Sequence, residues 1–124
     1  MFTGCFGKMK SYPKNKGLRY ISIARFNRFW KGEKYIKLAP PAEIINIGDE
    51  KLYTKLYYEK VLNNLNPQKV YEELGENAVL LCFEKWDDVE TGETFCHRRI
   101  VAKWLESNIK DLKVEELLRK PFIM

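Results

Sequence analysis

A continuous apolar run of strand length lies in the second half of the chain, from Ala78 to Phe83. A strand that faces water on one side alternates apolar and polar residues, whereas an unbroken apolar run is typical of a strand covered on both faces. Such strands belong to parallel sheets, whose neighbouring strands are joined by crossover connections that are usually helical. The run therefore predicts an α/β protein, and it leads directly into a carboxylate, Glu84.

Helical patterns follow and precede this strand. From Asp49 to Leu65, apolar residues recur at intervals of three and four positions, which predicts a long amphipathic helix. Asn66 and Pro67 provide an N-cap and a proline at the first helical position of a second helix, which Gly75 ends. A third amphipathic helix is predicted from Cys96 to about Ser107.

The remaining segments divide into short strands and loops. We predict strands at Phe2 to Phe6, Leu18 to Arg25 and Leu112 to Val114, and loops at Lys8 to Gly17, Phe26 to Pro41 and Lys85 to Phe95. Strands separated by helices indicate a small, mostly parallel sheet with helices packed on both faces, a Rossmann-like three-layer arrangement. With 124 residues, the chain fits one α/β domain over residues 1–124.

Composition limits the compartment and the partners. No window approaches the length of apolar sequence that a membrane span requires, so we expect no membrane partner. The chain has only three cysteines (Cys5, Cys82 and Cys96), and this small, odd number argues against a disulfide framework. Cysteines without disulfides favour a cytoplasmic protein with reduced thiols. The sequence does not indicate the oligomeric state.

Positive charge is concentrated in the first third of the chain. Between Lys8 and Lys37, ten lysines and arginines face a single acid, Glu33, whereas residues 61–124 carry nine basic and twelve acidic side chains. This asymmetry favours an anionic partner, although a basic surface can also serve solubility alone.

Polar residues follow the predicted strands at the point where each strand ends. The carboxyl ends of parallel strands share one edge of the sheet, where ligands usually bind in open α/β sheets. There we expect Arg25, Glu84 and the start of the third helix to form one polar cluster. The candidate catalytic residues are Glu84, Cys96 and His97, and the candidate ligand-binding residues are Thr3, Arg25, Trp30 and Arg98.

Helical geometry assigns faces at the start of the third helix. Cys96 and His97 fall on the line of the apolar stripe, Arg98 falls on its flank, and Arg99 falls on the solvent face, so Arg98 is the predicted functional arginine. A helix start attracts anions and favours the thiolate form of a cysteine. Structural roles also fit: Cys96 as a small residue at a close contact, and His97 as a helix cap.

The segment from Phe26 to Tyr35 interleaves aromatic and basic residues, including Trp30. Such a composition can stack bases and neutralise phosphates. It also fits a lid that folds back over the sheet edge, which we favour because exposed aromatic rings promote aggregation. Either arrangement places rings beside the cluster and suggests a ligand with a phosphate and a ring.

The motif Leu-Leu-Cys-x-Glu (residues 80–84), followed by Cys-His-Arg (residues 96–98) at the head of a helix, resembles the domain of unknown function 488 (DUF488) family. The resemblance extends upstream to Ile21 to Arg25, which is similar to an early strand of that family ending in arginine. It implies an α/β fold and a polar cluster of Arg25, Glu84, Cys96, His97 and Arg98. The family has no assigned activity.

Several chemistries are disfavoured by spacing. A zinc site formed by Cys5, Cys82, Cys96 and His97 matches no finger or ribbon, and we expect Cys82 to be a small buried hydrophobe that points away from the sheet edge, so no metal is predicted. A Cys-x5-Arg phosphatase is excluded because position 102 is alanine. Neither a P-loop nor a dinucleotide fingerprint occurs, and no cofactor is predicted.

These patterns lead to two functional hypotheses. The first is a small domain that binds a phosphorylated, nucleotide-like ligand at the carboxyl edge of the sheet and acts on it as a hydrolase or transferase. The second is a non-catalytic accessory module of a phage or mobile element that binds nucleotides or a nucleic-acid end. The sequence leaves open whether the chain is an enzyme, and a purely structural cluster is a third interpretation.

Overall fold

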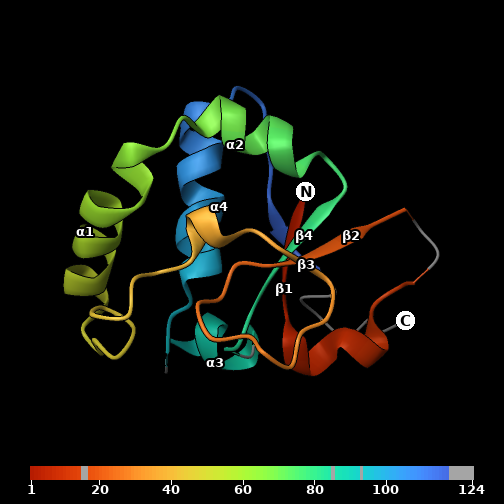
Figure 1. Ribbon diagram of the computed structural model, residues 1–124, viewed down its shortest axis with the longest axis horizontal. Helices are drawn as coiled ribbons and strands as arrows, with labels where there is room; N and C mark the ends of the chain where they lie inside the picture. The colour runs from red at the N-terminus through yellow and green to blue at the C-terminus, as the bar shows by residue number, and fades with distance from the viewer. Residues whose placement is uncertain (15–16, 85, 93, 118–124) are drawn as a thin grey trace.

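Five strands form one sheet, and every described strand pair is parallel. The structure, a computed structural model, describes residues 1–14, 17–84, 86–92 and 94–117. The strands have the order β3-β2-β4-β1-β5. Figure 1 labels β1, β2, β3 and β4. The small α/β class predicted from the sequence is confirmed. The strands are β1 (Phe2–Cys5), β2 (Arg19–Ser22), β3 (Glu33–Lys34), β4 (Ala78–Cys82) and β5 (Glu115–Glu116).

The strand β4 occupies the middle of the sheet, as its apolar run predicts. All five of its residues are buried. It pairs with β1, where Cys82 lies opposite Cys5, and with β2 on its other side. Ala78 and Leu80 pack in one hydrophobic cluster, whereas Val79 and Leu81 pack in a second one on the opposite face. The alternation of side chains along β4 therefore divides the core into two halves.

Two of the predicted helices begin at the predicted positions, and each has a capping side chain. The Asp49 carboxylate accepts a hydrogen bond from the Leu52 N–H at 3.0 Å, and Asn66 Oδ1 accepts one from the Lys69 N–H at 3.1 Å. Gly75 follows the second helix with φ of 88°, a conformation that glycine adopts without strain. The α-helices are α1 (Glu50–Lys60), α2 (Pro67–Leu74), α3 (Trp86–Thr91) and α4 (His97–Asn108), and the 3-10 helices are η1 (Phe6–Ser11), η2 (Ile36–Leu38) and η3 (Leu62–Asn64). Within the described ranges, no helix has the length and apolar character needed to cross a membrane.

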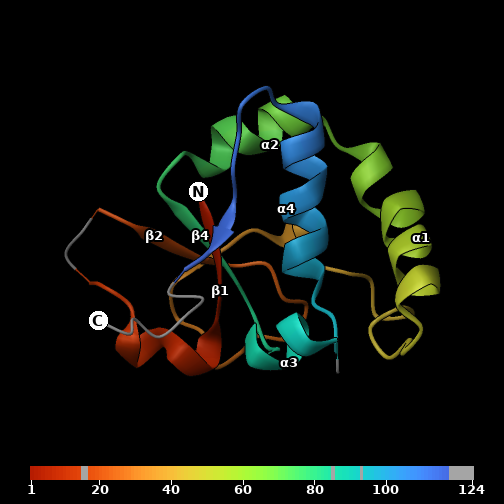
Figure 2. The same ribbon diagram turned by 180° about the vertical axis from the view of Figure 1, so that it is seen from behind.

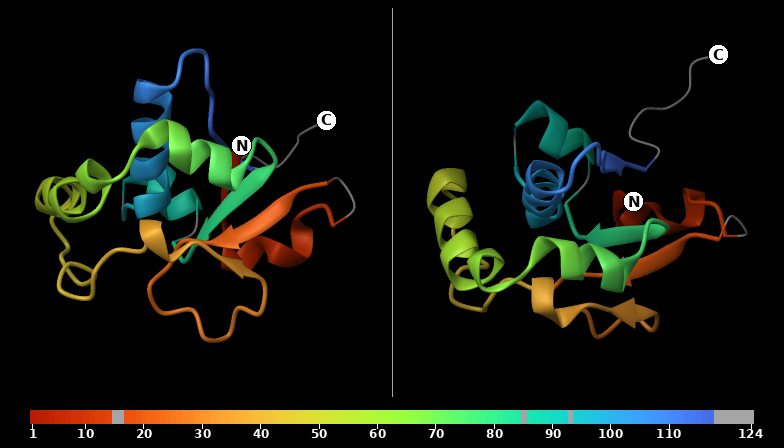
Figure 3. Two further views of the ribbon diagram at one scale, coloured as in Figure 1. Left: turned by 45° about the horizontal axis from the view of Figure 1, so that its top comes forward. Right: turned by 90° about the horizontal axis from the view of Figure 1, so that it is seen from above.

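The two faces of the sheet are covered unequally. The helices α1, α2 and α4 supply the buried partners of the larger cluster, whereas η1 and its flanking segments cover the other face. Figures 2 and 3 show α1 and α4 on one side of the sheet and η1 on the other. The handedness of crossovers links their direction along the sheet to the face they cover. The connections from β3 to β4 and from β4 to β5 both advance toward the β5 edge of the sheet, so they cross the same face. The connection from β1 to β2 runs in the opposite direction and crosses the other face.

Short elements replace the three predicted loops. The segment expected to be a loop after Arg25 contains β3 and η2, the segment after Cys5 contains η1, and the acidic segment after Glu84 contains α3. The last strand is β5 (Glu115–Glu116) rather than Leu112 to Val114. These elements have two to six residues, too few for a hydrophobic period to identify them in the sequence.

Candidate functional site

A cavity of about 550 Å³ lies at the carboxyl edge of the sheet. Its walls come from the residues that follow β2, the end of β4, the segment before α1, the first turns of α1, the segment before α4 and the start of α4. Ligands of open parallel sheets bind at this edge. The lining residues are Ala24, Arg25, Phe26, Pro40, Ile45, Asn46, Ile47, Gly48, Glu50, Tyr53, Cys82, Phe83, Glu84, Gly92, Thr94, Phe95 and His97.

Arg25 lies in the wall of this cavity, as predicted. Its Nε donates a hydrogen bond to the carbonyl oxygen of Pro40 at 2.9 Å, and its Nη2 donates one to that of Ala39 at 3.4 Å. The side chain is half-buried. These bonds use only part of the donor fork of the guanidinium, so further N–H groups remain to bind a ligand.

Two carboxylates share the cavity with Arg25. Glu84 follows the end of β4, and Glu50 stands in the first turn of α1. Glu50 was not among the predicted site residues, although its place directly after the N-cap Asp49 marks it as a helix-start acid. Tyr53, one turn further along α1, also lines the cavity, and burial raises the pKa of its phenol above the usual value. The Tyr53 hydroxyl therefore stays protonated and can donate a hydrogen bond.

Cys82, Cys96 and His97 form a thiol–imidazole cluster beside the cavity. The ligand atoms of all three lie within 4.8 Å of one another, and all three residues are buried. His97 Nδ1 lies 3.3 Å from the Cys82 sulfur, and His97 Nε2 donates to the carbonyl oxygen of Ile23 at 2.8 Å. The Cys82 sulfur also lies 3.6 Å from Glu84 Oε1.

The prediction that Cys82 points away from the sheet edge is wrong. Cys82 is the last residue of β4, and it alternates onto the face of Ala78 and Leu80, which α4 covers. Its sulfur therefore meets the first turn of α4. The predicted thiolate preference of Cys96 is also wrong, because burial raises the pKa of this thiol well above its usual value despite the opposing effects of His97 and Arg98.

Arg98 does not lie in the cavity with Arg25, so this prediction is wrong. It is fully buried and forms a bidentate ion pair with Glu116 of β5, with Nε–Oε1 and Nη2–Oε2 distances of 3.0 Å. Thr3, another predicted ligand-binding residue, is equally buried and donates to Glu116 Oε1 at 2.7 Å. Arg99, predicted on the solvent face, instead donates to Thr3 Oγ1 at 2.8 Å. These four residues join α4, β1 and β5.

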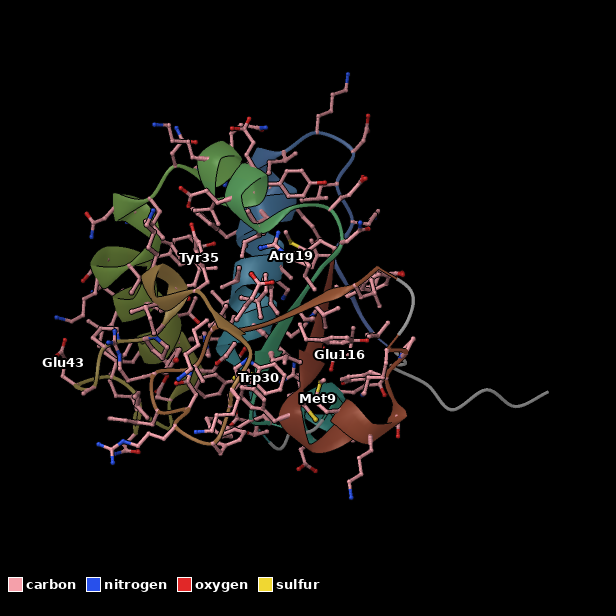
Figure 4. The ribbon with its side chains drawn as sticks, turned by 45° about the vertical axis from the view of Figure 1, so that its right-hand side comes forward. Met9, Arg19, Trp30, Tyr35, Glu43 and Glu116 are labelled. Atoms are coloured by element: carbon pink, nitrogen blue, oxygen red, sulfur yellow. The ribbon has the colours of Figure 1, made fainter. Side chains whose placement is uncertain are left out.

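Trp30 lies outside the cavity as well. Its ring packs against Phe6 with centroids 5.5 Å apart, and its Nε1 donates to the carbonyl oxygen of Glu33 at 2.8 Å. Trp30 and Met9 of η1, both labelled in Figure 4, pack on the second hydrophobic cluster. The residues of the predicted lid therefore lie in two places. Phe26 lines the cavity, whereas Trp30 packs on the face of the sheet that η1 covers.

An exposed aromatic patch adjoins the cavity. Phe29 and Phe83 are 56% and 48% exposed, and their ring centroids are 5.8 Å apart. Phe6 contacts both rings at 4.9 and 5.1 Å. Phe26, which lines the cavity, is 66% exposed. The rings thus continue from the cavity onto the surface, where the basic residues Arg28 and Lys31 are also exposed.

Comparisons with protein-family models, with curated proteins and with solved structures find no match to this chain. The family resemblance seen in residues 80–84 and 96–98 therefore stays a prediction.

Proposed function

We propose that this chain binds a phosphorylated, nucleotide-like ligand in the cavity at the carboxyl edge of the sheet. The observation that carries the proposal is the presence of Arg25 and Glu84 in the wall of one cavity together with aromatic rings. A volume of about 550 Å³ falls in the usual range of small-molecule pockets, roughly 300 to 1,000 Å³.

Each part of such a ligand has a matching side chain. The Arg25 fork suits the planar, bidentate contacts that a phosphate accepts. The rings of Phe26, Phe83 and Phe95 provide apolar surface for a base. The carboxylates of Glu50 and Glu84 accept hydrogen bonds from sugar hydroxyls or base amino groups, so these acids do not conflict with an anionic ligand held at Arg25.

The proposal extends to hydrolase or transferase chemistry on this ligand, with Glu84 as the general base. Glu84 lies beside the thiol–imidazole cluster, with its Oε1 3.6 Å from the Cys82 sulfur, and it follows the central strand by two residues. A positioned carboxylate that takes a proton from water or from a hydroxyl group contributes roughly 10²- to 10⁴-fold to a rate. The three free thiols favour a reducing compartment, so we place this activity in the cytoplasm.

A binding screen tests the proposal. Thermal shift and calorimetry with AMP, ADP, ADP-ribose and a phosphosugar should give at least one saturable ligand, since specific binding stabilises the folded state by mass action. Arg25→Ala should weaken that ligand by roughly 10- to 100-fold, the effect of losing hydrogen bonds to a charged group. Arg28→Ala is the matched control, because Arg28 is exposed on the same segment and does not line the cavity. Equal effects of the two substitutions, or no ligand at all, would refute the proposal.

A nucleic-acid-binding module is the second candidate function. It is favoured by the exposed rings of Phe26, Phe29 and Phe83 next to the basic segment from Arg25 to Lys37. Bases stack on such rings with little sequence preference, while lysines and arginines neutralise phosphates. Binding of a single-stranded oligonucleotide that weakens steeply with salt and with Phe29→Ala, in the absence of a mononucleotide ligand, would favour this candidate over the first.

A further inference from the structure

The thiol–imidazole cluster is the group of buried reactive side chains that the proposed ligand does not explain. Cys82 ends β4, Cys96 precedes α4 and His97 opens α4, so the three residues reach one point from the central strand and from the helix that covers it. Cys82 and Cys96 are each 2% exposed and His97 is 5% exposed. Two sulfur atoms and one imidazole nitrogen are a set of ligands that Zn²⁺ prefers.

The spacing of these atoms fits a tetrahedral ion. With Zn–S bonds of about 2.3 Å and Zn–N bonds of about 2.0 Å, two ligand atoms on one tetrahedral ion lie about 3.5 to 3.8 Å apart. The ligand atoms of Cys82, Cys96 and His97 lie within 4.8 Å of one another, and the Cys82 sulfur lies 3.3 Å from His97 Nδ1. The separations therefore exceed the tetrahedral spacing by about 1 Å at most.

The hydrogen bonding of His97 provides a second, independent observation. A carbonyl oxygen only accepts, so the bond to Ile23 places the proton of a neutral imidazole on Nε2. The lone pair is then on Nδ1, which is the nitrogen that faces the thiols. Metal-binding histidines usually donate their other N–H to a carboxylate or to a backbone carbonyl, and this contact fixes the tautomer and the orientation of the ring.

Arg98 offers further support from outside the cluster. Its Nη1 is a buried N–H group without a hydrogen-bond partner among the described residues, and the side chain stands two positions after Cys96. A metal-bound thiolate would supply an acceptor in this part of the core, which neutral thiols supply only weakly. A bound Zn²⁺ would lower the pKa of both thiols and hold them as thiolates against the opposing effect of burial.

We propose that Cys82, Cys96 and His97 bind one Zn²⁺ ion, with its fourth coordination position open to the cavity. The open side follows from the lining of the cavity, which includes Cys82, His97 and the nearby carboxylate of Glu84. Three protein ligands with an open fourth position are typical of catalytic zinc sites. The assignment does not depend on the nucleotide-like ligand proposed above, because its test measures the metal itself.

Metal analysis of the full chain tests this site. Protein purified under reducing conditions without chelator and loaded with ZnCl₂ should retain about one zinc per chain after gel filtration, measured by plasma mass spectrometry. Replacement of zinc by Co²⁺ should give the thiolate-to-cobalt charge-transfer absorption and the intense visible bands of a tetrahedral site. Retention of less than about 0.1 zinc per chain by the folded wild-type protein would overturn the proposal.

Variants separate the ligands from their neighbours. Cys82→Ser, Cys96→Ser and His97→Gln should each reduce retained zinc at least tenfold, with circular dichroism used to select the folded variants. Cys5→Ser is the matched control, because Cys5 is 1% exposed and lies opposite Cys82 on β1 but is not part of the cluster. Cys5→Ser should keep the metal, and its loss in this variant would overturn the assignment of the ligands.

Separate measurements test the open coordination position of the zinc ion and the state of the Cys82 and Cys96 thiols. Glu84→Gln should retain zinc, whereas loss of zinc would make Glu84 a ligand and overturn the open position. A thiol titration should find both Cys82 and Cys96 protected in the zinc-loaded protein and reactive after unfolding with chelator. Isolation of a Cys82–Cys96 disulfide from reduced, zinc-loaded protein would instead identify a redox pair and refute the metal site.

Discussion

Arg98 of α4 and Glu116 of β5 form an ion pair that is closed off from solvent, with exposed side-chain fractions of 0% and 2%. The removal of one partner from such a pair leaves an uncompensated charge in the core. Arg98→Ala should therefore lower the free energy of unfolding by about 3 to 5 kcal/mol, measured by urea denaturation. Arg98→Met combined with Glu116→Leu should recover most of this loss, because apolar side chains of similar volume replace the whole pair. A small effect of Arg98→Ala would contradict this interpretation of the pair.

Thr3 contributes to stability through the same network. Its hydroxyl donates to Glu116 and accepts from Arg99. Thr3→Val keeps the volume and removes the hydroxyl, and we expect a loss of about 1 to 3 kcal/mol with no change in ligand affinity. Thr91→Val, at an exposed position of α3, should stay within about 0.5 kcal/mol of the wild type. An altered affinity in Thr3→Val would restore Thr3 to the ligand-binding residues.

A substitution at Glu84 tests ligand binding and catalysis separately. If the chain acts on its ligand, Glu84→Gln should reduce turnover by roughly 10²-fold or more while the dissociation constant changes little, because the amide keeps the shape of the side chain but takes up no proton. Turnover measured at saturating ligand, next to calorimetric binding, makes this comparison. Full turnover in Glu84→Gln would remove Glu84 from the chemistry.

Because Tyr12 is buried, we expect the free energy of unfolding to decrease at alkaline pH. Its hydroxyl oxygen accepts a hydrogen bond from the Cys5 N–H at 3.0 Å, and burial raises the pKa of its phenol to about 12. Below about pH 9 the phenol is neutral in both the folded and the unfolded state. Between about pH 10 and 12 the unfolded chain releases this proton first, so the free energy of unfolding should decrease as the pH rises.

The variant Tyr12→Phe isolates this effect. Urea denaturation between pH 9 and 12 should give a shallower decrease for Tyr12→Phe than for the wild type, although other buried tyrosines contribute to both curves. The variant should also be less stable at neutral pH, because the Cys5 N–H loses its acceptor. Parallel curves for the two proteins would show that Tyr12 is not the group that titrates.

The sequence predicted the elements that carry their own local signals. Asp49, Asn66 and Gly75 mark helix ends through hydrogen bonds within one turn, and the unbroken apolar run of β4 reports burial on both faces. Arg25 and Glu84 were placed correctly beside one cavity, because the ends of parallel strands share an edge.

Contacts between distant segments were not predictable in this way. The position of Arg98 on the helix flank gives no sign that Glu116, 18 residues later, packs against it. The strand β3 has only a glutamate and a lysine, and its pairing with β2 decides its conformation. The meeting of Cys82 with His97 depends on which face of β4 the helix α4 covers, which no periodicity specifies.

The two outermost strands of the sheet bear on how the protein behaves in concentrated solution. Both β3 and β5 are two residues long, and their sequences are Glu-Lys and Glu-Glu. A short border with exposed charges at Glu33, Lys34 and Glu115 offers an incoming polypeptide few backbone groups to pair with and requires it to desolvate these ions. Crowded molecules of this protein should therefore resist joining border to border into extended fibrils.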